Sequence, residues 1–329
     1  MRFPLRIAAV VVVCVACAIS LRSGAESPES AASTQVKQAA FTHASSDDAG
    51  TQSVRFGRQP SRLGDRIEQN VQLEMRMKLT MRRESELVGN NQTTVRTKQR
   101  RVIVATAVEG GTIMAARVQY PEATKQATAA DGAAKNGEVS AAYQPVAQPV
   151  QGKTYLCMRE PGENGKLNVT DETGNRPPTE ECDIVVAQMD MIGRSNPLAQ
   201  FLAGREVKVG ESFELPKELA SRVFNLGDKF GEVTHFELTL RKVSVENGAK
   251  CAEFLANVEA AANGASQMRL QVEGPLVVQA DTCRAVRVDL DGPIGMSETR
   301  GSYSTSYQVI GTGHLKTSVA ATYREAQHD

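Results

Sequence analysis

The feature that most constrains the fold is a long stretch of strict alternation between residues 67 and 81. Gln69 alone departs from this pattern, in which the apolar positions are Ile67, Val71, Leu73, Met75, Met77, Leu79 and Met81. Period two places successive side chains on opposite faces of a strand, so the segment predicts one buried and one wet face. At about 3.3 Å per residue this strand is about 50 Å long, which predicts a twisted and curved sheet.

A turn motif that introduces this strand recurs along the chain. Its copies are Leu63-Gly64-Asp65-Arg66-Ile67, Val209-Gly210-Glu211-Ser212-Phe213 and Leu226-Gly227-Asp228-Lys229-Phe230. The glycine suits a tight turn, and the acid that follows can accept a hydrogen bond from nearby backbone. Leu73–Met77 and Phe236–Leu240 continue the likeness with the same alternation. The repetition predicts an internal β-duplication.

Further strands and helices follow from shorter patterns. Two hairpins are expected, around Gly110-Gly111 and around Gly311-Thr312-Gly313, while Gly274-Pro275 is expected to separate two strands. Helical spacing of apolar residues begins at Thr179, and a second short helix ends near Gly204. The sequence therefore predicts a mainly β protein with a large antiparallel curved sheet, a half-barrel or a sandwich, and a short helical insertion around 179–204.

The N-terminus has the pattern of a secretory signal peptide. A basic start and an apolar run from Ile7 to Leu21 precede the small residues Ser23-Gly24-Ala25. Cys14-Val15-Ala16-Cys17 resembles a bacterial lipobox, so lipid-anchored attachment to the envelope through Cys17 is the minor alternative. The predicted organisation is a signal peptide at 1–25, a disordered linker at 26–53, a first β-unit at 54–121, a loop at 122–150, and a second β-unit with the helical insertion at 151–325.

Export agrees with the cysteines of the mature chain, which are Cys157, Cys182, Cys251 and Cys283. An even number of cysteines in an oxidising compartment predicts two disulfides. Of the three pairings, Cys157–Cys182 and Cys251–Cys283 are favoured because each joins segments that are close in sequence. These four cysteines contain no C-x-x-C pair, so their spacing does not predict a zinc site.

No motif for catalysis, a cofactor or a metal stands out, so the sequence predicts no enzyme, no cofactor and no metal site. His235 and His314 have no third ligand of a suitable type nearby in sequence. Glu180, Glu181 and Asp183 are explained by the preference of a helix N-terminus for acids. The mature chain has no excess of basic residues, which argues against nucleic-acid binding, and no later segment is apolar enough to cross a membrane.

Charge is nevertheless unevenly distributed. The segment from Arg55 to Arg101 holds 12 basic and five acidic residues. A solvated, aggregation-resistant sheet face is one explanation, and a docking face for anionic groups is the other. The candidate ligand-binding residues are the methionines of the long strand and the cations that follow it, namely Met75, Met77, Met81, Arg96, Lys98, Arg100 and Arg101. Because alternation places the methionines and the cations of the long strand on opposite faces, one ligand can reach both kinds of residue only if the sheet curves or the cluster of residues 96–101 folds over.

Three short motifs carry a resemblance to a known group of proteins. They are Gly152-Lys153-Thr154-Tyr155, the helix start at Pro177-Pro178 with Glu180-Glu181, and the strand start at Val207 with Val209-Gly210-Glu211. In these the chain resembles uncharacterised exported β-rich proteins of Gram-negative bacteria, of the kind common in myxobacteria. The resemblance implies a compartment and a fold and no activity.

Together these features predict an exported, non-catalytic envelope protein, periplasmic or extracellular, that binds an amphiphilic or lipid-like ligand. The alternative is a protein–protein interaction module or structural component of the envelope, with another envelope protein as its partner. A deep apolar groove lined by Met75, Met77 and Met81 would favour the first hypothesis, whereas a closed core would favour the second.

Overall fold

The computed structural model describes residues 52–83, 86–131, 144–160, 165–224, 231–262, 266–300 and 306–326. The predicted signal peptide, the lipobox with Cys17, nearly all of the predicted linker and the third copy of the turn motif lie outside these residues. Both predicted β-units contribute strands to the same sheet, and their division into two units stays a prediction.

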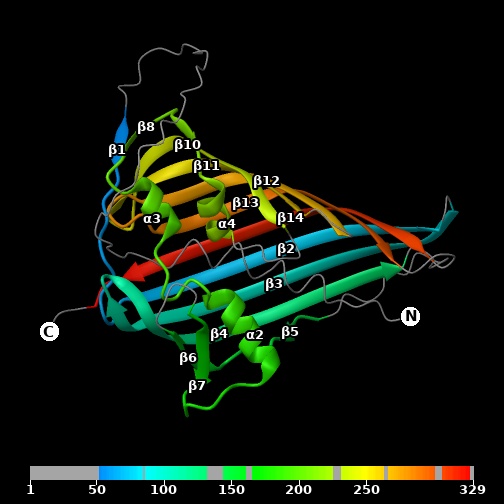
Figure 1. The fold of residues 1–329 in the computed structure, drawn as a ribbon, viewed down its shortest axis with the longest axis horizontal. Coiled ribbons are helices and arrows are strands. Elements are labelled where there is room, and N and C mark those ends of the chain that lie inside the picture. The colour runs from blue at the N-terminus through cyan, green and yellow to red at the C-terminus, as the bar shows by residue number, and fades with distance from the viewer. Residues whose placement is uncertain are drawn as a thin grey trace.

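The fold is mainly β, as predicted, and is built on one large antiparallel sheet that does not close (Figure 1). In the described residues the sheet has 12 strands, in the order β7-β6-β4-β3-β2-β14-β13-β12-β11-β10-β9, and β5 pairs with β4. These strands are β2 (Arg66–Arg83), β3 (Glu86–Glu109), β4 (Thr112–Asp131), β5 (Val146–Ala147), β6 (Thr154–Arg159), β7 (Leu167–Asp171), β9 (Ser212–Glu214), β10 (Glu232–Glu246), β11 (Ala249–Ala262), β12 (Ser266–Gln279), β13 (Ala285–Arg300) and β14 (Tyr307–Arg324). A separate two-stranded sheet joins β1 (Ser53–Arg55) to β8 (Glu206–Lys208).

In the described residues, three short helices cover one face of the sheet. They are α2 (Thr179–Met189), α3 (Pro197–Leu202) and α4 (Lys217–Phe224), the first two within the predicted insertion. Figure 1 shows them in front of one end of the sheet, while β2, β3, β13 and β14 continue past them. We call the helix-bearing face the inner face and the opposite face the outer face. No described helix is both long and apolar enough to cross a membrane.

Two apolar clusters pack on the inner face. The larger joins β2 and the strands from β14 to β10 to α3 and α4, and it includes Leu73, Leu315 and Phe224. The smaller joins β3, β4 and β6 to α2, and it includes Ile103 and Val185. The alternation in β2 therefore corresponds to a buried and an exposed face, as predicted. The odd-numbered residues from 67 to 77 are buried, and the residues between them are largely exposed.

The recurrent turn motif has the same geometry in the two copies that the structure describes. Gly64 and Gly210 both have positive φ, 84° and 89°. In each copy the acid that follows accepts a hydrogen bond from the backbone three residues before it: Arg62 N donates to Asp65 Oδ2 at 3.0 Å, and Lys208 N donates to Glu211 Oε2 at 2.9 Å. The predicted use of the glycine and the acid is confirmed for these two turns, while the duplication itself stays a prediction.

Three sequence predictions at glycines and loops were wrong. β4 runs as far as Asp131, so the first part of the predicted loop at 122–150 is strand. β14 passes through Gly311-Thr312-Gly313 without a turn, and β12 passes through Gly274-Pro275. The physical reason is close approach: a Cβ atom on Gly274 would lie 2.0 Å from the carbonyl oxygen of Asp289, so the glycine serves packing between strands rather than a turn.

Neither predicted disulfide is present in the structure. The four described cysteines are free thiols, and all are buried. Cys283 Sγ instead donates to the carbonyl oxygen of Gly57 at 3.2 Å, and Cys251 Sγ to that of Ala249 at 3.5 Å. Burial raises the pKa of Cys157 to about 12, and the neighbouring Cys182 adds to the effect. Cys157 and Cys182 belong to the same apolar cluster, but the predicted disulfide between them is absent.

Candidate functional site

The methionines of the predicted site belong to a larger apolar row on the inner face. Cross-strand partners run from Met268 on β12 to Met296 on β13, then to Gly311 on β14 and Leu79 on β2. The next row toward the helices places Gly313 opposite Met77. We define the methionine strip as Met75, Met77, Leu79, Met81, Met268, Met296, Gly311 and Gly313. It holds five of the ten methionines in the sequence.

Side chains from two strands converge above the glycines of this strip. A Cβ atom on Gly311 would lie 2.5 Å from Met296 Cγ and 2.9 Å from Met77 Cε. A Cβ atom on Gly313 would lie 2.4 Å from Met77 Sδ. The glycines therefore provide room for methionine side chains to lie across β14. Met75 and Met77 are buried, whereas Met81 and Leu79 are partly exposed toward the far end of the sheet.

Three of the predicted cations lie on the outer face, away from the methionine strip. Arg96 contacts Glu74 at 3.1 Å, Lys98 contacts Glu122 at 2.8 Å, and Arg100 contacts Glu68 at 3.4 Å. Hydrogen bonds from Arg66 and Arg100 hold the pKa of Glu68 below its ordinary value, and Arg96 and Arg76 do the same for Glu74. These cations form a network of partly exposed ion pairs across β2, β3 and β4.

The fourth predicted cation, Arg101, lies on the inner face and is 0% exposed. It pairs across β2 and β3 with Gln69, the one polar residue in the buried set of β2. The sequence contained the signal for this placement, because Arg101 shares odd parity with the buried Val95 and Ile103.

Arg101 is part of a group of inner-face polar residues on β2, β3 and β4. We define the polar seam as Gln69, Thr97, Gln99, Arg101 and Lys125. Thr97 pairs with Lys125 across β3 and β4, and Gln99 Nε2 donates to Gln148 Oε1 at 3.0 Å. Burial lowers the pKa of Lys125, partly opposed by the carboxylate of Glu180. Among the residues that the structure describes, neither amide atom of Gln69 has a hydrogen-bond partner, nor does Thr97 Oγ1.

α2 contributes a further polar residue and a carboxylate to the inner face. Gln188 is buried, and neither of its amide atoms has a hydrogen-bond partner in the described part of the chain. Glu181 accepts from Tyr155 Oη at 2.7 Å and from Lys153 Nζ at 2.5 Å. Burial raises the pKa of Glu181, but these two hydrogen bonds outweigh it, so the pKa lies below its ordinary value. Glu181, which the sequence analysis explained by the helix dipole, thus also links α2 to β6 through its hydrogen bond with Tyr155.

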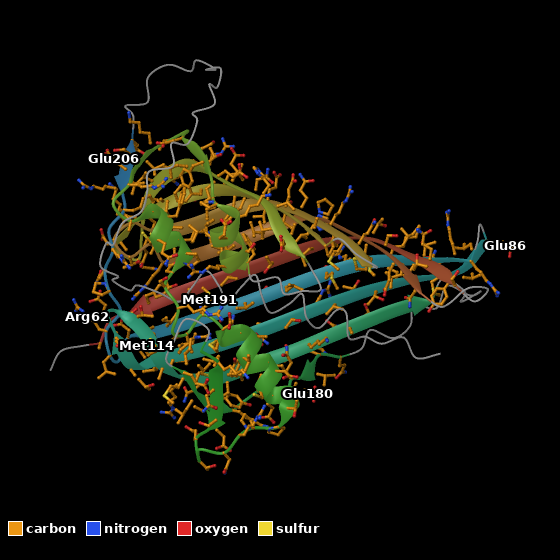
Figure 2. All side chains as sticks on the ribbon, in the orientation of Figure 1. Arg62, Glu86, Met114, Glu180, Met191 and Glu206 are labelled. Atoms are coloured by element: carbon orange, nitrogen blue, oxygen red, sulfur yellow. The ribbon has the colours of Figure 1, made fainter. Side chains whose placement is uncertain are left out.

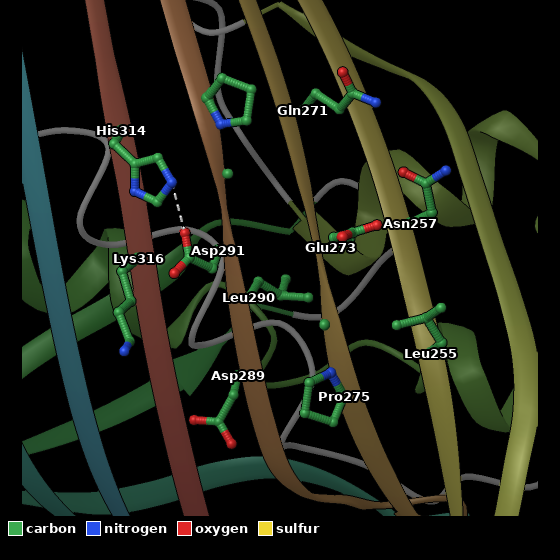
Figure 3. A pocket seen from close by; sticks show the side chains of 13 residues that line it. Leu255, Asn257, Gln271, Glu273, Pro275, Asp289, Leu290, Asp291, His314 and Lys316 are labelled. Atoms are coloured by element: carbon green, nitrogen blue, oxygen red, sulfur yellow. Dashed lines mark ion pairs between the residues drawn. The ribbon is translucent and has the colours of Figure 1, made fainter.

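The outer face carries a shallow open depression of about 700 Å³ across β11–β14 (Figure 3). His314 Nε2 lies 2.8 Å from Asp291 Oδ1 there, and both side chains are about half exposed. His235 lies on β10, separated from His314 by three strands, and contacts Glu214 at 3.1 Å. The structure therefore does not bring the two histidines together. Within the described residues no group of three or more histidine, cysteine or acidic side chains could hold a metal ion.

The comparisons with known proteins give structural likenesses at low identity. No protein-family model matches the sequence, and no curated protein matches it. A solved structure described as lipid–protein interactions in lipovitellin is similar with a TM-score of 0.37 and 8% identity, covering 82% of this chain and 26% of that chain. The translocator domain of the autotransporter NalP from Neisseria meningitidis is similar with a TM-score of 0.17 and 8% identity, covering 78% of this chain and 88% of that chain.

Proposed function

We propose that this protein is an exported, non-catalytic envelope protein that binds an amphiphilic, lipid-like ligand along the methionine strip. The observation that carries the proposal is the convergence of Met77 and Met296 above Gly311 on the inner face. Methionine is unbranched and polarisable, so a surface of methionines can adapt to an apolar chain that has no fixed shape. A rigid core of the same size would favour branched residues, which pack in fewer rotamers.

The position of the strip supports the same function. α3 and α4 pack on the larger cluster, while the strands that carry Leu79, Met81 and Met296 continue past the helices (Figure 1). Figure 2 places Glu86 at the far end of the sheet and Met191 near its helix-bearing end. Along β2, Met81 and Leu79 are partly exposed and lie nearer the far end of the sheet than the buried Met77 and Met75, so the exposure of the strip increases toward that end.

The test uses the neutral fluorescent probe N-phenyl-1-naphthylamine and two variants of β2 that differ in face. Met81→Lys places a charge at a partly exposed inner position, where a change is compatible with folding. Thr80→Lys is the matched control, because it introduces the same side chain one residue away on the opposite face. We expect Met81→Lys to weaken probe binding at least about tenfold, which corresponds to about 1.4 kcal/mol, and Thr80→Lys to leave it unchanged.

Equal binding by both variants would overturn the inner-face site. No binding by the wild-type protein, together with no lipid retained in native mass spectrometry, would overturn ligand binding and favour the protein-interaction module instead.

A further inference from the structure

The polar seam lies on the same face as the methionine strip and directly beside it. On β2 and β3, Leu73 pairs with Thr97 and Met75 pairs with Val95. Neighbouring strands are about 4.8 Å apart, so apolar positions on β2 and polar positions on β3 are immediate neighbours. From Thr97 to Arg101 the seam extends about 13 Å along the strand. The inner face therefore has an apolar part and a polar part in one continuous surface.

The polar part contains groups whose burial is costly as it stands. Gln69 is 0% exposed and Thr97 is 5% exposed, and in the described structure neither the amide of Gln69 nor the hydroxyl of Thr97 has a hydrogen-bond partner. A buried polar group without a partner is destabilising, and native proteins rarely tolerate several of them together. A bound polar group would supply the missing partners.

The charges of the seam indicate the sign of that group. Arg101 is a buried guanidinium opposite Gln69, and Lys125 is an ammonium whose environment disfavours its charge. Within the described residues the carboxylate that acts on Lys125 belongs to exposed Glu180 on α2. An anion bound at the seam would favour the charged form of Lys125, interact favourably with the guanidinium of Arg101 and accept hydrogen bonds from the amide of Gln69.

We propose, on the basis of the proposed function, that the ligand is an anionic amphiphile: its head group, a carboxylate or a phosphate, binds the polar seam, and its apolar chain lies along the methionine strip. This arrangement needs no charge from the outer face. It also removes the geometric conflict between methionines and cations on opposite faces of β2 and β3, because Arg101 and Lys125 are on the methionine side.

The experiment measures displacement of N-phenyl-1-naphthylamine by three ligands that share an oleyl or oleoyl chain: oleate, oleoyl lysophosphatidate and oleyl alcohol. The first two carry a carboxylate and a phosphate, and the third has no charge. The variants are Arg101→Gln and, because a buried arginine can be needed for folding, Lys125→Met at a position that is only partly buried. Arg100→Gln is the matched control on the outer face.

We expect the wild-type protein to bind at least one of the anionic ligands at least about tenfold more tightly than oleyl alcohol. Lys125→Met and Arg101→Gln should remove this preference, and Arg100→Gln should keep it. No preference in the wild type, or a preference that survives in folded Lys125→Met, would overturn the anionic head-group site while leaving the proposed function intact. Failure of all three ligands to displace the probe would overturn the proposed function itself.

Discussion

The two faces of the β2–β3 pair solve the problem of polar side chains in different ways. On the outer face Arg96, Lys98 and Arg100 are about half exposed, and each has a carboxylate within 3.4 Å. On the inner face Gln69 is buried, and within the described residues its amide has no hydrogen-bond partner. Water and ion pairs can satisfy the outer groups, whereas the described structure supplies neither kind of partner to this inner amide. The comparison shows that residue parity, rather than residue type, decides which polar side chains of this strand pair are exposed and ion-paired and which are buried.

The largest expected effect comes from adding one methyl group to the inner face. In Gly313→Ala the new Cβ atom would lie 2.1 Å from the carbonyl oxygen of Arg76, whereas in Gly295→Ala the nearest such atom is 3.9 Å away. We expect Gly313→Ala to lower the free energy of unfolding by about 3 kcal/mol. Gly295→Ala should change it by about 0.5 kcal/mol at most, in the stabilising direction. Urea denaturation measures both, and equal effects would contradict the close packing above β14.

A smaller difference is expected between two hydrogen-bonded carboxylates. Glu181 on the inner side is 6% exposed, and Glu74 belongs to the ion pairs of the outer face. Glu181→Gln should cost about 2 kcal/mol, because Lys153 and Tyr155 lose a charged acceptor. Glu74→Gln should cost less than about 1 kcal/mol, since its partners remain solvated. Chemical denaturation at pH 7 compares the two, and a larger loss for Glu74→Gln would reverse the assignment of faces.

Glu181 also gives the stability of the folded protein a pH dependence of known sign. The pKa of Glu181 in the folded protein lies below its ordinary value of 4.5, so its contribution to stability is complete above that value and is lost as the pH falls through the folded pKa. We expect the wild-type protein to lose more stability than Glu181→Gln between pH 6 and pH 3. Identical pH profiles would show that this carboxylate has the same pKa in the folded and unfolded states.

The smallest effect is expected from the outer cations that first suggested a binding surface. Replacing Arg96, Lys98 and Arg100 together by glutamine should cost about 0.2–1 kcal/mol per ion pair at low salt and less at 1 M salt, where charges are screened. Displacement of the probe by oleate should be unchanged. Loss of oleate binding in this variant would place the head group on the outer face and contradict the polar seam.

Local periodicity predicted much of the fold because each face of a long strand meets one environment. The buried set of β2, the helical insertion after Thr179 and the open antiparallel sheet all follow from such patterns. Glycine was misleading, because the same residue permits a turn at Gly64 and a close strand contact at Gly313. Sequence alone does not distinguish these uses, since the atom that approaches Gly313 belongs to Arg76, which is distant in sequence.

The candidate site likewise has one part that the sequence could predict and one part that it could not. The inner placement of Arg101 was predictable from parity with Val95, once β3 was known to extend that far. The convergence of Met268, Met296 and Met77 was not, because it depends on the register of four strands from opposite ends of the chain. Register between distant strands is set by the whole sheet, so no local pattern contains it.

The pairing of β2 with β14 also sets the order in which the protein can form. The first and last long strands lie side by side in the middle of the sheet, and Thr317 Oγ1 donates to the carbonyl oxygen of Gln72, 245 residues away. Contacts of such separation close large loops and form slowly. During synthesis from the N-terminus, the edge of β2 that pairs with β14 must therefore stay unpaired until β14 has been made. In a protein truncated before β14, both β2 and β13 would be exposed edges, which are open to pairing with other chains.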